Sequence, residues 1–194
     1  MLLPVATRSE TAAMTRQALL DAAGALLDAG GPDAVTLREV GARTGVSRSA
    51  PYRHFESKDT LLTALATNAM TQLGDRLESL AAEADSPEQS LRAALVSLLD
   101  IGRTRPHLYR IMFITPAGDP TAAVEAAGRT QDLFLHLVGR LVGRRRARHY
   151  GALLLTAAHG ATSFESSSHF VWDKWHTTAE GVIDALIALL PTKK

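Results

Sequence analysis

Apolar residues recur along much of the chain at intervals of three and four, the spacing that places side chains on one face of an α-helix. Two stretches show this spacing clearly, residues 15–29 and residues 58–84. The Gly-Gly-Pro sequence at 30–32 follows the first stretch, and these residue types end helices. Residues 1–14 precede that helix, and we expect them to form a flexible N-terminal arm.

Further helices are predicted by the same spacing together with local start and stop signals. Ser57 and Ser86 suit helix N-caps, and Pro87 suits a first helical position. The segment 115–120, TPAGDP, predicts a loop. The other helices of this part of the chain are expected at residues 87–103, 106–114, 121–141, 146–168 and 174–190. No pattern predicts a strand, so we expect an all-α fold with nine helices.

The segment 36–58 predicts two short helices joined by a tight turn. Thr36 suits an N-cap, and Gly45 can adopt the left-handed conformation that ends a helix. Ser47 is expected to cap the second helix, which carries hydrogen-bonding side chains as far as Phe55. A helix, a glycine-containing turn and a polar second helix form the helix-turn-helix arrangement of DNA-binding proteins.

Composition agrees with a helical protein of ordinary globular type. Of the 194 residues 46% are apolar, and alanine and leucine dominate, which favours helix over sheet. The chain has no cysteine, so disulfides and thiolate chemistry are excluded. We find neither a signal peptide nor an apolar run of about 20 residues, and therefore expect a cytoplasmic protein with no membrane span.

The charge of the chain is uneven. A net charge of +1 argues against a general nucleic-acid coat protein, which is normally strongly basic. Local charge governs phosphate attraction, because salt screens charges over a Debye length of about 8 Å. Between Thr36 and Lys58 the basic residues are Arg38, Arg43, Arg48, Arg53 and Lys58, against Glu39 and Glu56.

Four short signals stand in register in this part of the chain: TLREVG at 36–41, GVS at 45–47, YRHF at 52–55 and SKDTLL at 57–62. With a helix before them and a long helix after them, they resemble the tetracycline-repressor (TetR) family of bacterial transcription regulators. The resemblance implies a three-helix helix-turn-helix DNA-binding domain at 15–60. It also implies a roughly six-helix ligand-binding and dimerisation domain at 61–194.

The resemblance further implies that residues 48–55 form a recognition helix in the major groove of double-stranded DNA. Arg48 and Arg53 can bind guanine edges or phosphates, and Phe55 is expected to pack inward. Pro51 stands where an apolar residue is usual, and we place it about four residues into the helix, where a missing N–H is tolerated. The predicted DNA contacts are Thr36, Ser47, Arg48, Ser49, Tyr52, Arg53, His54 and Lys58.

Large side chains in the later helices predict a pocket for an apolar small-molecule effector. An ordinary core is the alternative for each of them. His159 and Glu165 are the expected polar anchors, although a satisfied core or interface pair explains them equally well. The candidate ligand-binding residues are Tyr109, Met112, Phe113, Phe134, Leu137, His159, Phe164, Glu165 and Trp172.

The last two helices are expected to form a homodimer. Small residues cluster at 156–163, and residues 182–190 carry an apolar face. Packing of both helices against a symmetry mate would place two recognition helices about 34 Å apart, one turn of DNA. Burial within the same subunit is the alternative. The family mechanism is a two-state switch in which ligand lowers DNA affinity, which describes a repressor.

Other classes of protein fit the sequence less well than this regulator. No phosphate loop, nucleophile elbow or zinc-protease pattern is present. His169 and His176 lie seven residues apart, and two ligands are too few for a metal site. We therefore expect no catalytic residue, no metal and no cofactor. A helical small-molecule carrier or an enzyme without DNA binding is the main alternative, and a helical adaptor that has lost DNA binding is another.

Overall fold

The computed structural model describes residues 7–83, 86–170 and 172–192, and within them the chain forms ten helices and no strand. The expected all-α fold is confirmed. The helices are α1 (Arg8–Ala34), α2 (Leu37–Thr44), α3 (Ala50–His54), α4 (Lys58–Glu83), α5 (Pro87–Thr104), α6 (Pro106–Ile111), α7 (Thr121–Val142), α8 (Arg144–Ser166), α9 (Trp172–Trp175) and α10 (Ala179–Ala188).

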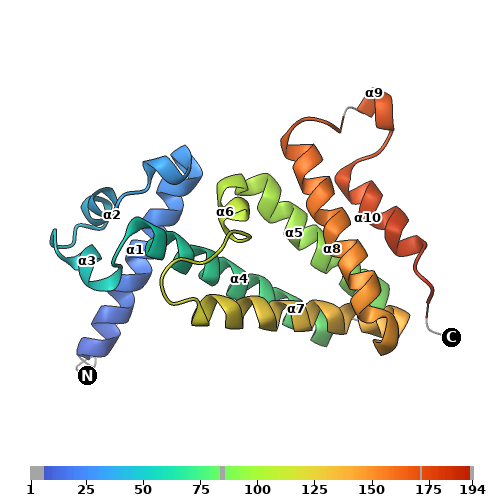
Figure 1. The fold of residues 1–194 in the computed structure, drawn as a ribbon, viewed down its shortest axis with the longest axis horizontal. Coiled ribbons are helices and arrows are strands. Elements are labelled where there is room, and N and C mark those ends of the chain that lie inside the picture. The colour runs from blue at the N-terminus through green and yellow to red at the C-terminus, as the bar shows by residue number, and fades with distance from the viewer. Residues whose placement is uncertain (1–6, 84–85, 171, 193–194) are drawn as a thin grey trace, which may run out of the picture.

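The short helices α2 and α3 gather against α1 at one end of the molecule (Figure 1). The long helix α4 leaves this end and runs beside α7 through the larger helical part. Helices α8 and α10 pack together at the opposite end, where α10 also contacts α5. One leucine-rich core extends through both parts, so α4 connects them as a packed element.

Local capping explains where several helices begin. The Thr36 hydroxyl accepts a hydrogen bond from the Glu39 amide at the start of α2. The Ser57 hydroxyl accepts one from the Thr60 amide at the start of α4, and Ser86 caps α5 with Pro87 in its first turn. Each bond satisfies an N–H group that has no partner within its helix. These predicted starts are confirmed.

The N-terminal arm predicted at residues 1–14 is wrong from Arg8 onward, because α1 begins there. The Thr7 hydroxyl accepts a hydrogen bond from the Glu10 amide, and the Glu10 carboxylate accepts one from the Thr7 amide. This reciprocal capping box starts the helix a full two turns early. Residues 1–6 lie outside the described part of the chain.

The C-terminal part also differs from the prediction. The single helix expected at 174–190 is two helices, α9 and α10, separated by residues 176–178. His176 has a positive φ of 49°, and the Thr178 hydroxyl accepts a hydrogen bond from the Gly181 amide, which starts α10. The described residues therefore contain ten helices where nine were expected.

Candidate nucleic-acid interface and ligand cavity

The turn between α2 and α3 is held by close packing at its base. Gly45 ends α2 in the left-handed conformation, with φ 67°. A Cβ atom on Gly41 would lie 2.8 Å from Pro51 Cγ, so the two helices approach too closely for any larger residue there. Phe55 is 4% exposed, and the Arg16 guanidinium of α1 lies 5.3 Å from its ring centroid. The expectation that Phe55 packs inward is confirmed.

Helix α3 is shorter than predicted. Residues 48 and 49 form a turn, and the helix begins at Ala50. The predicted N-cap at Ser47 is wrong, because its hydroxyl lies 3.4 Å from that of Ser49 while its carbonyl oxygen accepts from the Ala50 amide. Pro51 is in the first turn of α3, where its missing N–H costs nothing. The expectation that Pro51 lies about four residues into the helix is therefore wrong.

The side chains predicted to contact DNA lie around this turn. Most of them are exposed: Thr36, Ser47, Arg48, Ser49, Tyr52 and Arg53. His54 and Lys58 are half-buried. Lys58 Nζ lies 3.8 Å from the Asp33 carboxylate, an exposed ion pair of little energy. Within the described residues, Arg48 and Arg53 form no ion pair, so their positive charges face solvent.

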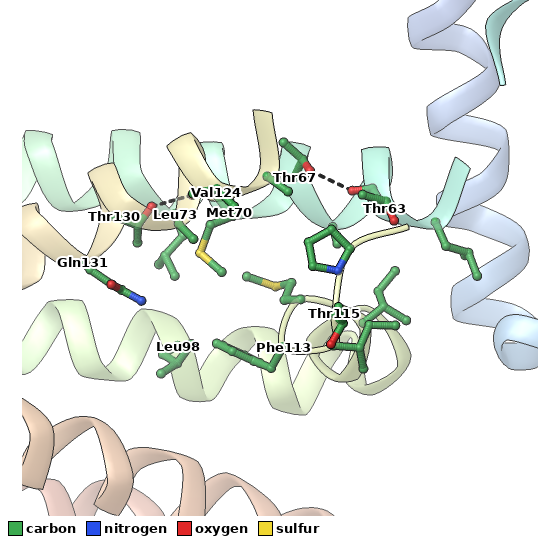
Figure 2. A pocket seen from close by; sticks show the side chains of 18 of the residues that line it. Thr63, Thr67, Met70, Leu73, Leu98, Phe113, Thr115, Val124, Thr130 and Gln131 are labelled. Atoms are coloured by element: carbon green, nitrogen blue, oxygen red, sulfur yellow. Dashed lines mark hydrogen bonds between the residues drawn. The ribbon is translucent and has the colours of Figure 1, made fainter. Parts of the chain in front are cut away.

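A cavity of about 540 Å³ lies in the larger helical part. Helix α4 forms one wall, and the other walls come from α5, α7, a residue of α8 and the segment 111–117 (Figure 2). This volume falls in the range of small-molecule sites. Phe113, Ile114 and Val124 line it although they are 46%, 60% and 61% exposed, which makes its rim apolar as well.

The structure places three of the predicted ligand-binding residues, Met112, Phe113 and Phe134, on the cavity wall. Leu137 is fully buried in the core and does not line it. The sequence could not separate wall from core, because both use large apolar side chains at the same helical spacing.

Tyr109 and His159 lie next to the cavity without lining it. Their side chains share a hydrogen bond between the Tyr109 hydroxyl and His159 Nδ1, and the Phe113 ring meets the His159 ring edge-on at 4.3 Å. Burial raises the pKa of Tyr109 and lowers the pKa of His159. Both shifts favour the neutral forms, so this pair suits an uncharged hydrogen bond.

The remaining candidates lie elsewhere. The Glu165 carboxylate accepts a 2.7 Å hydrogen bond from Arg103, which also binds Glu180. Glu165 therefore does not form the anchor pair with His159. Phe164 is 51% exposed and stacks on His169 beside a separate small hollow. Trp172 begins α9, but its side chain lies outside the described part of the structure.

Sequence reasoning missed the contribution of α4 to the cavity. Thr63, Thr67, Met70 and Leu73 line it, and Gln131 lines it from α7 (Figure 2). A signal was present in the sequence, because Thr63 and Thr67 are four residues apart and therefore share one face of an otherwise apolar helix. None of the ligand-binding residues predicted from the sequence lies on this helix.

Two further features are absent from the described residues. These residues contain no group of three or more histidine, aspartate or glutamate side chains that could hold a metal ion. None of the helices that they form is both long and apolar enough to cross a membrane.

The helix-turn-helix and the cavity together define a class of DNA-binding transcription regulators. A family model described as bacterial regulatory proteins, tetR family, matches residues 19–65. A second, described as tetracyclin repressor-like, C-terminal domain, matches residues 91–190, which is more than half of the chain. The chain belongs to the TetR family of transcriptional regulators.

Individual proteins are similar to this chain in sequence or in fold. The chain is 30% identical over 126 residues to an uncharacterised HTH-type transcriptional regulator of Mycobacterium tuberculosis, a match that covers 65% of this chain and 59% of that protein. A protein of unknown function from Rhodococcus sp. RHA1 has a similar structure, with a TM-score of 0.74, 24% identity and coverage of 90% and 92% of the two chains. The SmeT–triclosan complex has a TM-score of 0.57, 25% identity and coverage of 90% of each chain.

Proposed function

We propose that this protein is a ligand-responsive repressor that binds a palindromic DNA operator as a homodimer and is released by a small apolar molecule. One observation carries the proposal: the helix that begins at Lys58, directly after the helix-turn-helix, also forms a wall of the cavity. A molecule that moves this wall would also move the start of α4. Ligand and DNA occupancy are then linked through one packed element.

The DNA contacts are proposed from exposure and chemistry. Arg48 and Arg53 project positive charge beside the turn and suit guanine edges or phosphates. Tyr52, which is 58% exposed, can donate to a phosphate or touch a thymine methyl group. Ser47 and Ser49 are small enough to let α3 approach the bases.

Three further groups would position the complex on the phosphate backbone. The amide at Thr36 and the amine of Lys58 stand at helix N-termini, where anions are favoured. His54 can donate from its ring. The start of α3 at Ala50 puts Arg48 and Ser49 in the turn, so we propose that they contact DNA from that turn and that Tyr52 contacts it from the helix.

The proposed dimer uses α8 and α10, at the end of the molecule away from α1–α3 (Figure 1). Part of the predicted apolar face is already used within the subunit, because Ile183 and Ile187 are buried. Two residues lie on the outer face of α8. Leu153 is 53% exposed, and a Cβ atom added to Gly160 would have no other atom within 4 Å. Small and apolar residues on an outer face allow the close approach of a second helix.

We further propose that the protein is a regulator and not an enzyme. The cavity lining consists mostly of aliphatic, aromatic and threonine side chains, and its ionisable residue among those described is Asp59. Such a lining binds apolar molecules but supplies no paired acid and base. The SmeT–triclosan complex supports small-molecule binding within this type of fold.

Selection of bound fragments from a random DNA pool tests the proposal. We expect the recovered sequences to share an inverted repeat whose half-sites lie about one helical turn apart. Recovery of no enriched sequence by correctly folded protein would contradict the proposal, and would favour a helical small-molecule carrier.

A further inference from the structure

The cavity is elongated along α4. Its lining on this helix extends from Asp59 to Leu77, about 27 Å along a helix that rises about 1.5 Å per residue. Polar groups lie toward its two ends, with Thr63 and Thr115 at one and Thr130 and Gln131 at the other (Figure 2). Apolar side chains make up most of the remaining wall, among them Met70, Leu73, Leu98 and Phe113. This shape fits a long apolar body with a polar end.

The lining of the cavity carries negative charge and no positive charge among the described residues. Among the described residues that line the cavity, Asp59 is ionisable, and none is a lysine, arginine or histidine. Two cations next to lining residues have carboxylate partners: Lys58 lies 3.8 Å from Asp33 in an exposed pair, and Arg129 donates to Asp75 and Glu78 on α4. An anion that entered this cavity would lose its water without gaining a counter-charge, which is strongly unfavourable.

Part of the hydrogen-bonding pattern of the wall supports the same conclusion. The Thr67 hydroxyl donates to the Thr63 carbonyl oxygen, and the single proton of the Thr130 hydroxyl is shared between the carbonyl oxygens of Met70 and Ala126. The protons of these two hydroxyls are therefore committed, and what they offer a ligand is lone pairs. The Thr63 hydroxyl accepts from the Ala117 amide, and among the described residues the Thr63 and Thr115 hydroxyl protons have no acceptor, so these two groups can both donate and accept. A carboxylate can only accept hydrogen bonds, whereas an ammonium or hydroxyl group can donate them. Gln131 supplies amide donors at the far end, but no positive charge.

We infer that the molecule recognised by this cavity is an elongated apolar compound whose polar end is cationic or uncharged, and that Asp59 favours the cation. The inference rests on the proposed function only in treating this molecule as the effector. Anionic amphiphiles such as fatty acids should bind more weakly, because the described lining holds no cation to pair with them.

Calorimetric titration with three matched ten-carbon compounds, each below its micelle concentration and without DNA, tests the inference. We expect decylammonium and 1-decanol to bind, and decanoate to bind at least about tenfold more weakly, because only decanoate buries an unpaired negative charge. Binding of decanoate equal to or tighter than that of 1-decanol would overturn the inference, as would the absence of binding by all three compounds.

Variants locate the binding and identify the residue that sets charge preference. Asp59→Asn should weaken decylammonium binding about threefold or more and leave 1-decanol binding unchanged, since only the cation uses the carboxylate. Ala127→Phe places a ring in the cavity and should abolish binding, whereas Ala122→Phe on the exposed face of the same helix should not. Unchanged binding by Ala127→Phe, or unchanged charge preference in Asp59→Asn, would overturn the inference.

These titrations contain no DNA, so their outcome is separate from that of the proposed function. If the protein ranks the three compounds as expected but enriches no DNA sequence, the inference about the ligand stands and the proposed function is contradicted. If the protein enriches an inverted repeat but prefers decanoate, the proposed function stands and the inference about the ligand is contradicted.

Discussion

The backbone amide of Ala117 donates a hydrogen bond to Thr63 Oγ1 at 2.9 Å, which ties the segment between α6 and α7 to the first turns of α4. Both residues line the cavity. The same segment contacts α4 again at Gly118, where an added Cβ atom would lie 3.0 Å from Thr60 Cγ2. Thr60 belongs to the cap that starts α4 at Ser57. The cavity rim is therefore connected to the point where α4 leaves the helix-turn-helix.

Replacing Thr63 tests the hydrogen bond that its hydroxyl accepts from the Ala117 amide. Thr63→Val should lower the free energy of unfolding by about 1 kcal/mol, the net contribution of one hydrogen bond, and Tm by about 2–4 °C. Hydrogen exchange of the Ala117 amide should accelerate. Thr71→Val is the matched control, because the Thr71 hydroxyl bonds only within α4 and is exposed. If Ala117 exchange were equal in both variants, the tie to Thr63 would be absent.

The close approach of Gly41 and Pro51 makes a second prediction. Gly41→Ala should destabilise the protein by about 1–3 kcal/mol, because the new methyl group forces α2 and α3 apart. DNA affinity should fall at temperatures where the variant is still folded. In α7, Gly128→Ala meets no atom within 4 Å and should stabilise by about 0.5–1 kcal/mol. Thermal melts and DNA titrations compare the Tm and the DNA affinity of the two variants. Equal values for Gly41→Ala and Gly128→Ala would contradict the close packing of Gly41 against Pro51.

Oligomeric state is the third prediction. Light scattering at micromolar concentration should give the mass of a dimer for the wild-type protein. Leu153→Asp should give a monomer, because a carboxylate buried between two α8 helices has no counter-charge. Met14→Asp changes a comparably exposed residue of α1, 69% exposed, and should remain dimeric. A monomeric wild-type protein would exclude the operator model with two half-sites.

The fourth prediction concerns stability against pH. Burial lowers the pKa of His159 in the folded protein, while an unfolded histidine has a pKa of about 6.5. The unfolded chain therefore binds this proton first, and the stability that neutral His159 maintains is lost as pH falls below about 6.5. His159→Asn keeps an oxygen acceptor for Tyr109 but cannot titrate.

Measurements of Tm between pH 7.5 and 5.5 test whether His159 makes the folded protein less stable as pH falls. The wild-type protein should lose more stability over the interval than His159→Asn does, and the exposed His149→Asn control should follow the wild-type curve. A larger pH dependence in His159→Asn than in the wild-type protein would show that the histidine is charged when folded.

Local signals in the sequence predicted much of the fold. Thr36, Ser57 and Ser86 were identified as helix starts because an N-cap depends on atoms within three residues. The same reasoning failed at Ser47, where Pro51 sets the start of α3. The arm predicted at residues 1–14 does not include the capping box that Thr7 forms with Glu10.

The cavity was less predictable, because its wall is defined by contacts between distant segments. Met112, Phe113 and Phe134 are predicted from their size, but Thr63 and Gln131 come to line the same cavity only because α4 and α7 pack side by side. Leu137, at the same helical spacing as Phe134 and Gln131, is buried in the core. Tertiary packing decides whether such a residue lines the cavity or is buried in the core, and neither residue type nor helical spacing predicts which.

The central claim, a DNA-binding regulator that reads DNA through residues 36–58, is tested most directly by the salt dependence of binding. Fluorescence anisotropy with a palindromic fragment from beside its own gene should show log affinity falling linearly with log salt concentration. Arg48→Ala with Lys58→Ala should weaken binding, and the salt slope should flatten by about one for each phosphate that the variant no longer neutralises.

The matched control is Arg144→Ala with Arg145→Ala, which removes the same charge from the exposed start of α8. This control should bind DNA as the wild-type protein does. If affinity had no salt slope, and the Arg48→Ala, Lys58→Ala variant bound as well as its control, the account of this protein as a DNA-binding regulator would be contradicted.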